Sequence, residues 1–193
     1  MQTPAQSIVT YLQAKDGNRP HLMKRAFAAS ATLDIVVRTG TIAFPPHTAG
    51  LDAIEEVVVR NFARSYENVY TFCLSDPPGP EETAFSCPWL VGMSEKQGGA
   101  VRLGCGRYDW SFHPRSYLVE RLTITIDRMN TLPAASLDPV MAWLSGLPYP
   151  WCPAPLVVAS APRLDGVLEI VAPIASISPA RPPAPSPRPS RRS

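Results

Sequence analysis

Hydrophobic and polar positions follow two periods along this chain, first that of helices and then that of strands. Apolar residues recur at three- and four-residue spacing in 5–14 and 51–66, which is the period of a helix that buries one face. A shorter helix is predicted over 21–27, because Pro20 suits a first helical turn. Between the second and third helices, the β-branched run 32–38 predicts a strand.

The second half of the chain is dominated by extended runs. Strands are predicted over 69–74, 84–93, 101–112 and 118–127, separated by segments that hold the glycine or proline a reversal needs. A short helix is expected over 138–147. Helices followed by a meander of long strands indicate an α+β fold with an antiparallel sheet. Such a sheet, curved under its helices, leaves a ligand-sized cavity at its open end.

Composition changes after Pro153, which predicts a boundary there. The length of 193 residues suits one domain with an appendage, so we expect a domain over 1–153. Residues 154–193 hold a short apolar stretch, VLEIVAPIASI, and then a run rich in proline, arginine and serine. This second run has too few aromatic and β-branched residues to form a core, so 154–193 is predicted to be a disordered tail.

Charge and hydropathy limit the expected partners. Residues 154–193 hold five arginines against two carboxylates, whereas 1–153 hold 13 basic and 14 acidic residues. The domain has no basic footprint, so nucleic acid is not an expected partner, apart from a remote option through the arginine tail. No apolar run approaches the length of a membrane span, and the N-terminus is unlike a secretory signal. We therefore expect a cytoplasmic protein without membrane association.

The cysteines give no sign of a metal site or a disulfide framework. Four of them are widely spaced, with neither a C-x-x-C pair nor a histidine at zinc spacing: Cys73, Cys87, Cys105 and Cys152. Buried free thiols are expected instead. No nucleophile motif or phosphate-binding loop occurs, since GCGRYD lies inside a predicted strand, so no cofactor is expected.

Three segments resemble a known family when taken in order: FAASATLDI, FPPHTAGLDAIEEVV and GRYDWSF…LVERLTITI. Over residues 5–130 the chain is similar to the SnoaL-like branch of the nuclear transport factor 2-like (NTF2-like) superfamily. The resemblance implies a cone-shaped, curved antiparallel sheet with three N-terminal helices on its concave face. It also implies a homodimer, which we expect to form through the outer sheet face, and a pocket. Relatives use such pockets for isomerisation, dehydration, cyclisation, epoxide hydrolysis or binding alone.

Comparison with ketosteroid isomerases of this superfamily suggests candidate catalytic residues. Tyr11 matches a tyrosine that donates a hydrogen bond to a developing oxyanion, and Tyr108 takes the place of a protonated aspartate donor. Ile35 occupies the position of the base, with Asp34 just before it. Because strand side chains alternate, Asp34 reaches the pocket only if a bulge re-aims it. His47, in the loop before the third helix, is the other candidate base.

The walls of the pocket are predicted from the strand pattern. In 101–112, Tyr108 and Trp110 share one face, which we place inside, with Gly104 and Gly106 allowing curvature. Core packing is an equally good explanation of these aromatics. The remaining candidate ligand contacts, taken from a neighbouring strand and the loop before the third helix, are Trp89, Cys87 and Phe44.

Two functions remain open from the sequence. The first is a small-molecule pocket acting on an apolar organic substrate by proton transfer, as an isomerase, dehydratase or cyclase without cofactor. The second is a non-catalytic ligand-binding or interaction domain of the same fold, which the missing carboxylate at position 35 favours. The two hypotheses differ in whether a titratable group reaches the pocket floor.

Overall fold

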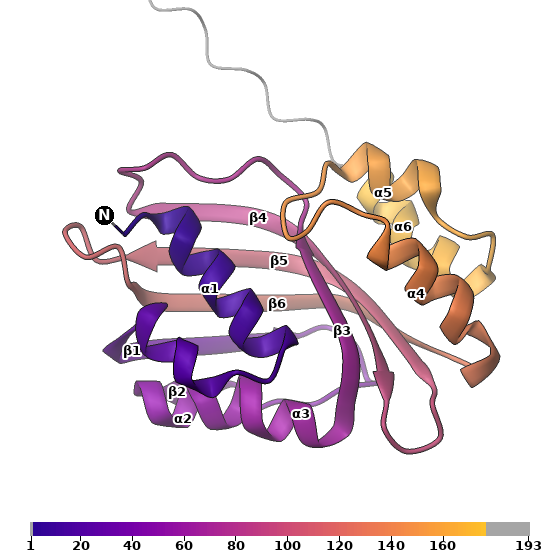
Figure 1. Cartoon of the computed structure of the whole chain (residues 1–193), viewed down its shortest axis with the longest axis horizontal. Helices are drawn as coiled ribbons and strands as arrows, with labels where there is room; N and C mark the ends of the chain where they lie inside the picture. The colour runs from indigo at the N-terminus through magenta and orange to yellow at the C-terminus, as the bar shows by residue number, and fades with distance from the viewer. Residues whose placement is uncertain (1, 177–193) are drawn as a thin grey trace, which may run out of the picture.

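The computed structural model describes residues 2–176, which form one curved sheet with helices on both faces (Figure 1). The strand order is β2-β1-β6-β5-β4-β3. Their bounds are β1 (Phe27–Val37), β2 (His47–Ala49), β3 (Tyr66–Cys73), β4 (Ala84–Glu95), β5 (Val101–Phe112) and β6 (Val119–Leu132). This sheet and its N-terminal helices confirm the α+β fold expected from the sequence.

The pairing of the strands is antiparallel with one exception. Neighbours from β3 to β6 run antiparallel, as does the β1–β2 pair, but β1 and β6 are parallel. Parallel neighbours need a long connection between them. Here the whole stretch from β2 to β5 separates β1 from β6 in sequence, so local patterning could not reveal the pairing.

The concave face of the sheet is covered by the N-terminal helices. They are α1 (Pro4–Asp16), η1 (Pro20–Arg25), α2 (Leu51–Glu55), η2 (Glu56–Asn61) and α3 (Phe62–Ser65). The last three are continuous, so they match the single helix expected over 51–66. At the start of α1, a capping box in which Thr3 and Gln6 bond each other's backbone satisfies the first free amides.

The outer face carries helices that the sequence did not lead us to expect. After η3 (Ala134–Ser136) and α4 (Leu137–Ser145), two more helices follow, α5 (Ala154–Ser160) and α6 (Asp165–Ala175). Figure 1 shows them grouped with α4 at one end of the sheet. Four residues of α6 are buried against the outer face: Val167, Ile170, Val171 and Ile174.

The expected boundary at Pro153 therefore falls inside the folded unit. Composition was misleading because VLEIVAPIASI supplies an amphipathic helix whose apolar side seals part of the outer face. Leu103 and Leu132 of the sheet belong to the same buried cluster as α4, α5 and α6. The rest of the expected tail, from residue 177 onward, lies outside the described residues.

The helices on the outer face also limit the area to which a second copy of the chain could bind. One end of that face is occupied by α4, α5 and α6. The other end presents exposed charges, including an ion pair between Arg107 Nε and Asp109 Oδ2 at 3.0 Å. A homodimer through the outer sheet face stays a prediction, restricted to this polar end.

Within residues 2–176, no helix combines the length and hydropathy that a bilayer crossing requires.

Candidate functional site

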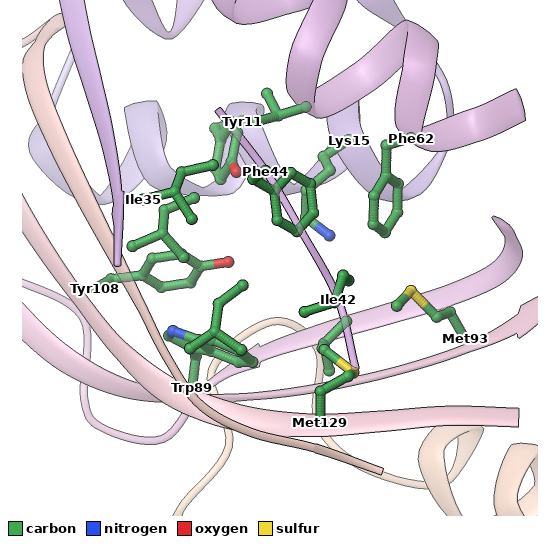
Figure 2. Close-up of a pocket in the computed structure, with 14 residues that line it drawn as sticks. Tyr11, Lys15, Ile35, Ile42, Phe44, Phe62, Trp89, Met93, Tyr108 and Met129 are labelled. Carbon is green, nitrogen blue, oxygen red and sulfur yellow. The ribbon is translucent and has the colours of Figure 1, made fainter. Parts of the chain in front are cut away.

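A cavity lies between the concave face of the sheet and the N-terminal helices (Figure 2). The cavity has a volume of about 60 Å³, which leaves room for more than one water molecule. Most of its wall is aliphatic, thioether or phenyl carbon. Among the 14 lining residues, four bear a side-chain nitrogen or oxygen: Tyr11, Lys15, Trp89 and Tyr108.

Each wall follows from the period of the element that supplies it. Tyr11 and Lys15 are four residues apart on α1, so they share one face of that helix. Ile35 points inward from β1, where buried and partly exposed residues alternate. The loop between β1 and β2 supplies Ile42 and Phe44, which lie across the cavity from Trp89 in Figure 2.

Close strand packing at two glycines shapes the floor of the cavity. A Cβ on Gly106 would lie 1.9 Å from the Thr125 carbonyl oxygen and 2.8 Å from the Trp89 ring. A Cβ on Gly104 would lie 2.8 Å from the Arg128 carbonyl oxygen and 2.5 Å from the Met129 methyl group. Both positions therefore require glycine, which confirms the close approach inferred from their place on the strand.

Several polar atoms around the cavity are donors without an acceptor. Tyr11 Oη and Trp89 Nε1 are buried and have no hydrogen-bond partner among the described residues; the same holds for Trp110 Nε1 behind the wall. Burial, and then the charge of Asp16, raises the pKa of Tyr11 well above its ordinary value, and the nearby Tyr108 hydroxyl offsets part of the rise. Burial likewise raises the pKa of Tyr108. Both hydroxyls therefore stay protonated at neutral pH and are able to donate.

Lys15 is the charged residue of the wall, and a compact network holds it. Its Nζ donates to Asp16 Oδ1 at 2.6 Å and to Thr71 Oγ1 at 2.7 Å. It also lies 4.9 Å from the centre of the Phe62 ring. Asp16 accepts further hydrogen bonds from the Thr71 amide, the Thr71 hydroxyl and the Tyr149 hydroxyl. The side chains of both Lys15 and Asp16 are less than 10% exposed.

The two candidate bases lie outside the cavity. Asp34 and His47 face each other across the β1–β2 pair, and His47 Nδ1 is 2.7 Å from Asp34 Oδ1. Their side chains are 39% and 60% exposed. The bulge in β1 lies between Phe27 and Thr32, so it leaves Asp34 on the face opposite Ile35. Their expected role in the pocket must therefore be corrected.

The other predicted site residues divide into two groups. Tyr11, Tyr108, Trp89 and Phe44 line the cavity together. Trp110 and Cys87 are buried but do not line it. Trp110 packs edge-on against Tyr11 and stacks on Phe112, whereas Cys87 neighbours Cys73.

The thiol pair behind the wall is poorly suited to nucleophilic chemistry. The Cys87 thiol, and then burial, raises the pKa of Cys73 well above its ordinary value. A protonated thiol is a weak nucleophile. Within residues 2–176, no group of three or more histidine, cysteine, aspartate or glutamate side chains is placed to hold a metal ion.

Sequence reasoning missed Lys15 and Asp16, which lie just beyond the helix predicted over 5–14. A lysine in a helix is ordinarily solvent-exposed, so composition gave no reason to place it inside. One signal was present: Lys15 follows Tyr11 by four residues, and a tyrosine that faces a pocket brings that position with it.

Comparisons with known proteins place the fold. Neither protein-family models nor curated proteins give a match. Solved structures do. An NTF2-like superfamily protein from Salmonella enterica subsp. enterica serovar Typhimurium shares 16% identity at a TM-score of 0.51, over 64% of this chain and 88% of its own. An NTF2-like protein from Burkholderia thailandensis shares 14% at 0.51, over 70% and 97%.

Two further similar structures are proteins with named small molecules. A computationally designed 17-OHP binder shares 12% identity at a TM-score of 0.52, over 67% of this chain and 99% of its own. A type 2 hexachlorocyclohexane dehydrochlorinase (LinA) shares 11% at 0.52, over 65% and 84%. At these identities the likeness is one of fold. The chain has the NTF2-like fold, with its cavity between the concave sheet face and the helices.

Proposed function

We propose that this protein binds a small, largely apolar molecule through an oxygen acceptor on that molecule. The observation that carries the proposal is a pair of buried donors on the wall of an apolar cavity, Tyr11 Oη and Trp89 Nε1, which have no partner among residues 2–176. An unpaired buried donor costs about 1–3 kcal/mol of stability. A ligand that brings an acceptor offsets this cost, because the hydrogen bond that the free protein lacks forms in the complex. The free energy of that hydrogen bond then contributes to binding.

The remaining chemistry of the wall favours binding over proton transfer. None of the 14 lining residues is a carboxylate or a histidine, so the described part of the chain offers no carboxylate or imidazole base at the cavity. The fold neighbours support a small-molecule role, since they include a designed 17-OHP binder as well as a dehydrochlorinase. Membership of the SnoaL-like branch remains part of the proposal.

Proton-transfer catalysis is the second candidate, and one observation favours it. Tyr11 and Tyr108 both point their hydroxyl groups into the cavity (Figure 2), and burial keeps both protonated. Two such donors can stabilise an oxyanion that develops on a bound carbonyl. The substrate would have to supply its own base, or water would, because Asp34 and His47 lie on the other face of β1.

Isothermal titration with a matched pair of probes tests the binding proposal. The probes are 1-indanone and indane, which share a ring skeleton and differ by the ketone oxygen. Because one or two hydrogen bonds are gained, we expect 1-indanone to bind about tenfold more tightly than indane. Equal affinities for the two probes would contradict the proposal that an oxygen acceptor is recognised. If neither probe bound, the proposal that the cavity is a ligand pocket would be contradicted.

A pair of variants on β1 locates the binding. Ile35→Phe adds bulk to the cavity and is expected to abolish binding of 1-indanone, because Ile35 lines the wall. Val36→Phe is the control, since Val36 is 43% exposed on the opposite face, and it is expected to bind as the native chain does. Undiminished binding by Ile35→Phe would place the ligand elsewhere.

A further inference from the structure

We propose that the ligand carries an anionic head group of the carboxylate kind, which pairs with the ammonium of Lys15, while its apolar part fills the cavity. This inference rests on the proposed function and adds the class of ligand to it. It is carried by the geometry of Lys15, Asp16 and the groove beside them.

The Lys15–Asp16 pair is oriented with its positive end toward the cavity. Lys15 lines the cavity and Asp16 does not; Asp16 instead lines a surface groove behind Lys15. Figure 2 shows the Lys15 nitrogen on the cavity side of Phe62. An anion in the cavity would meet the ammonium first, with the carboxylate of Asp16 beyond it.

Asp16 is held by further hydrogen bonds on the side away from the cavity. Besides Lys15, it accepts from the Thr71 amide and hydroxyl at 2.8 Å each and from the Tyr149 hydroxyl at 3.0 Å. Hydrogen bonds to a carboxylate disperse its charge. Asp16 therefore fixes the position of Lys15 without fully neutralising it on the cavity side.

The ammonium retains capacity for one more acceptor. Of its three N–H groups, two are used by Asp16 Oδ1 and Thr71 Oγ1. No acidic side chain lines the cavity among the described residues. In surroundings of low dielectric, an anion close to an ammonium gains more than it would in water. Together with the Tyr11 hydroxyl on the same helix face, Lys15 offers two donors to one carboxylate.

The groove explains how such a ligand reaches its place. Lys15 and Phe62 line both the inner cavity and the surface groove, so they lie at the boundary between the two. A polar head at this boundary stays near water, while the apolar part enters the cavity.

The test compares two isosteric probes on the full chain by isothermal titration at neutral pH and low salt. Indane-2-carboxylate carries the charge, and indane-2-carboxamide does not. We expect the carboxylate to bind about tenfold more tightly to the native protein, with the advantage shrinking as salt is added. In Lys15→Met, the affinity for the carboxylate should fall at least tenfold and the affinity for the carboxamide less than about threefold. Lys24→Met removes an equal charge from an exposed site and should change neither.

The outcomes separate this inference from the proposed function. Equal binding of both probes to the native protein overturns the anionic head group and leaves the pocket standing; binding of neither probe overturns both. An equal loss in Lys24→Met and Lys15→Met would show a general charge effect and overturn the role of Lys15. Lys15→Met leaves the buried carboxylate of Asp16 without its cation, which could destabilise the fold. The double variant Lys15→Met, Asp16→Asn removes both charges and therefore serves as the folded comparison. The comparison of the two probes on the native protein depends on neither variant.

Discussion

The buried hydroxyl of Tyr11 has no hydrogen-bond partner in the described part of the chain, at a place where the fold could have used phenylalanine. Its ring packs edge-on against Phe27 and Trp110, so the ring alone accounts for its packing. A buried, unpaired hydroxyl costs stability and is explained best by a partner that arrives from outside. The same reasoning applies to Trp89 Nε1.

Tyr11→Phe is therefore expected to separate stability from binding. The free energy of unfolding should stay the same or rise by about 1 kcal/mol, because an unsatisfied hydroxyl is removed. Affinity for 1-indanone should fall. Tyr149→Phe is the matched control: its hydroxyl bonds Asp16 Oδ2, so its loss should cost about 1 kcal/mol in urea unfolding. A Tyr11→Phe variant less stable than Tyr149→Phe would contradict this account.

Single residues also show where sequence reasoning stops. The alternation of β5 correctly turned Tyr108 inward, and the same rule put Asp34 outward, since a strand side chain has two choices. Lys15 escaped detection because its burial depends on Asp16 and Thr71, and Thr71 is 56 residues away along the chain. Periodicity carries no information about such a contact.

At the scale of elements, close strand packing determines the shape of the cavity. Gly106→Ala is expected to cost more than about 2 kcal/mol, because its Cβ would overlap the Thr125 carbonyl oxygen and press on Trp89. The variant should also weaken binding of 1-indanone. Thermal or urea unfolding measures the loss. Gly40→Ala, with no atom within 4 Å of the added Cβ, should change stability by less than about 0.5 kcal/mol. Equal losses of stability in Gly106→Ala and Gly40→Ala would contradict the claim that close strand packing requires glycine at position 106.

The helices on the outer face are expected to be integral to stability. Ile170 of α6 is fully buried, so Ile170→Ala should cost about 2–5 kcal/mol. Leu168 on the same helix is 43% exposed, and Leu168→Ala should cost less than about 1 kcal/mol. The two losses are compared by urea denaturation. A small effect of Ile170→Ala would mean that α6 only rests on the sheet.

Elements were predictable as far as local pattern decides them. The three N-terminal helical segments, the long strands and the helix near 138–147 all follow from periodicity and turn residues. The three-residue strand β2 is too short to leave a pattern. Helices α5 and α6 were missed because proline-rich surroundings suggested a tail, although α6 has a clear apolar face.

The whole molecule should lose stability in alkaline solution. Burial raises the pKa of Cys105 and of Cys152 from 9.0 to about 11, and it raises the pKa values of Tyr11 and Tyr108 above 10.0. The unfolded chain releases these protons first, so their contribution is complete below about pH 9 and is lost as the pH rises further. Urea midpoints measured from pH 7 to pH 11 should fall steadily above pH 9. A flat profile would contradict the burial of these groups.

The pairing of β1 with β6 and the sealing of the outer face are properties of the whole chain. Both join segments that are distant in sequence, and neither has a local signature. They matter for function because β1 and β6 supply neighbouring parts of the same wall, through the paired residues Ile35 and Ile124. The resemblance to the NTF2-like superfamily implied a curved sheet under helices, but neither this pairing nor the sealed outer face.

The most direct test of the central claim is a two-dimensional ¹H–¹⁵N NMR titration that follows the tryptophan indole N–H signals as 1-indanone is added. Trp89 lines the cavity, and its Nε1 has no partner within the described residues. Trp143 Nε1 donates to Ser160 Oγ at 3.1 Å on the outer face and provides the internal control. We expect the Trp89 signal to shift with saturation and the Trp143 signal to stay in place. A Trp89 signal that does not move while ligand binds, or that moves no more than that of Trp143, would contradict the proposed site.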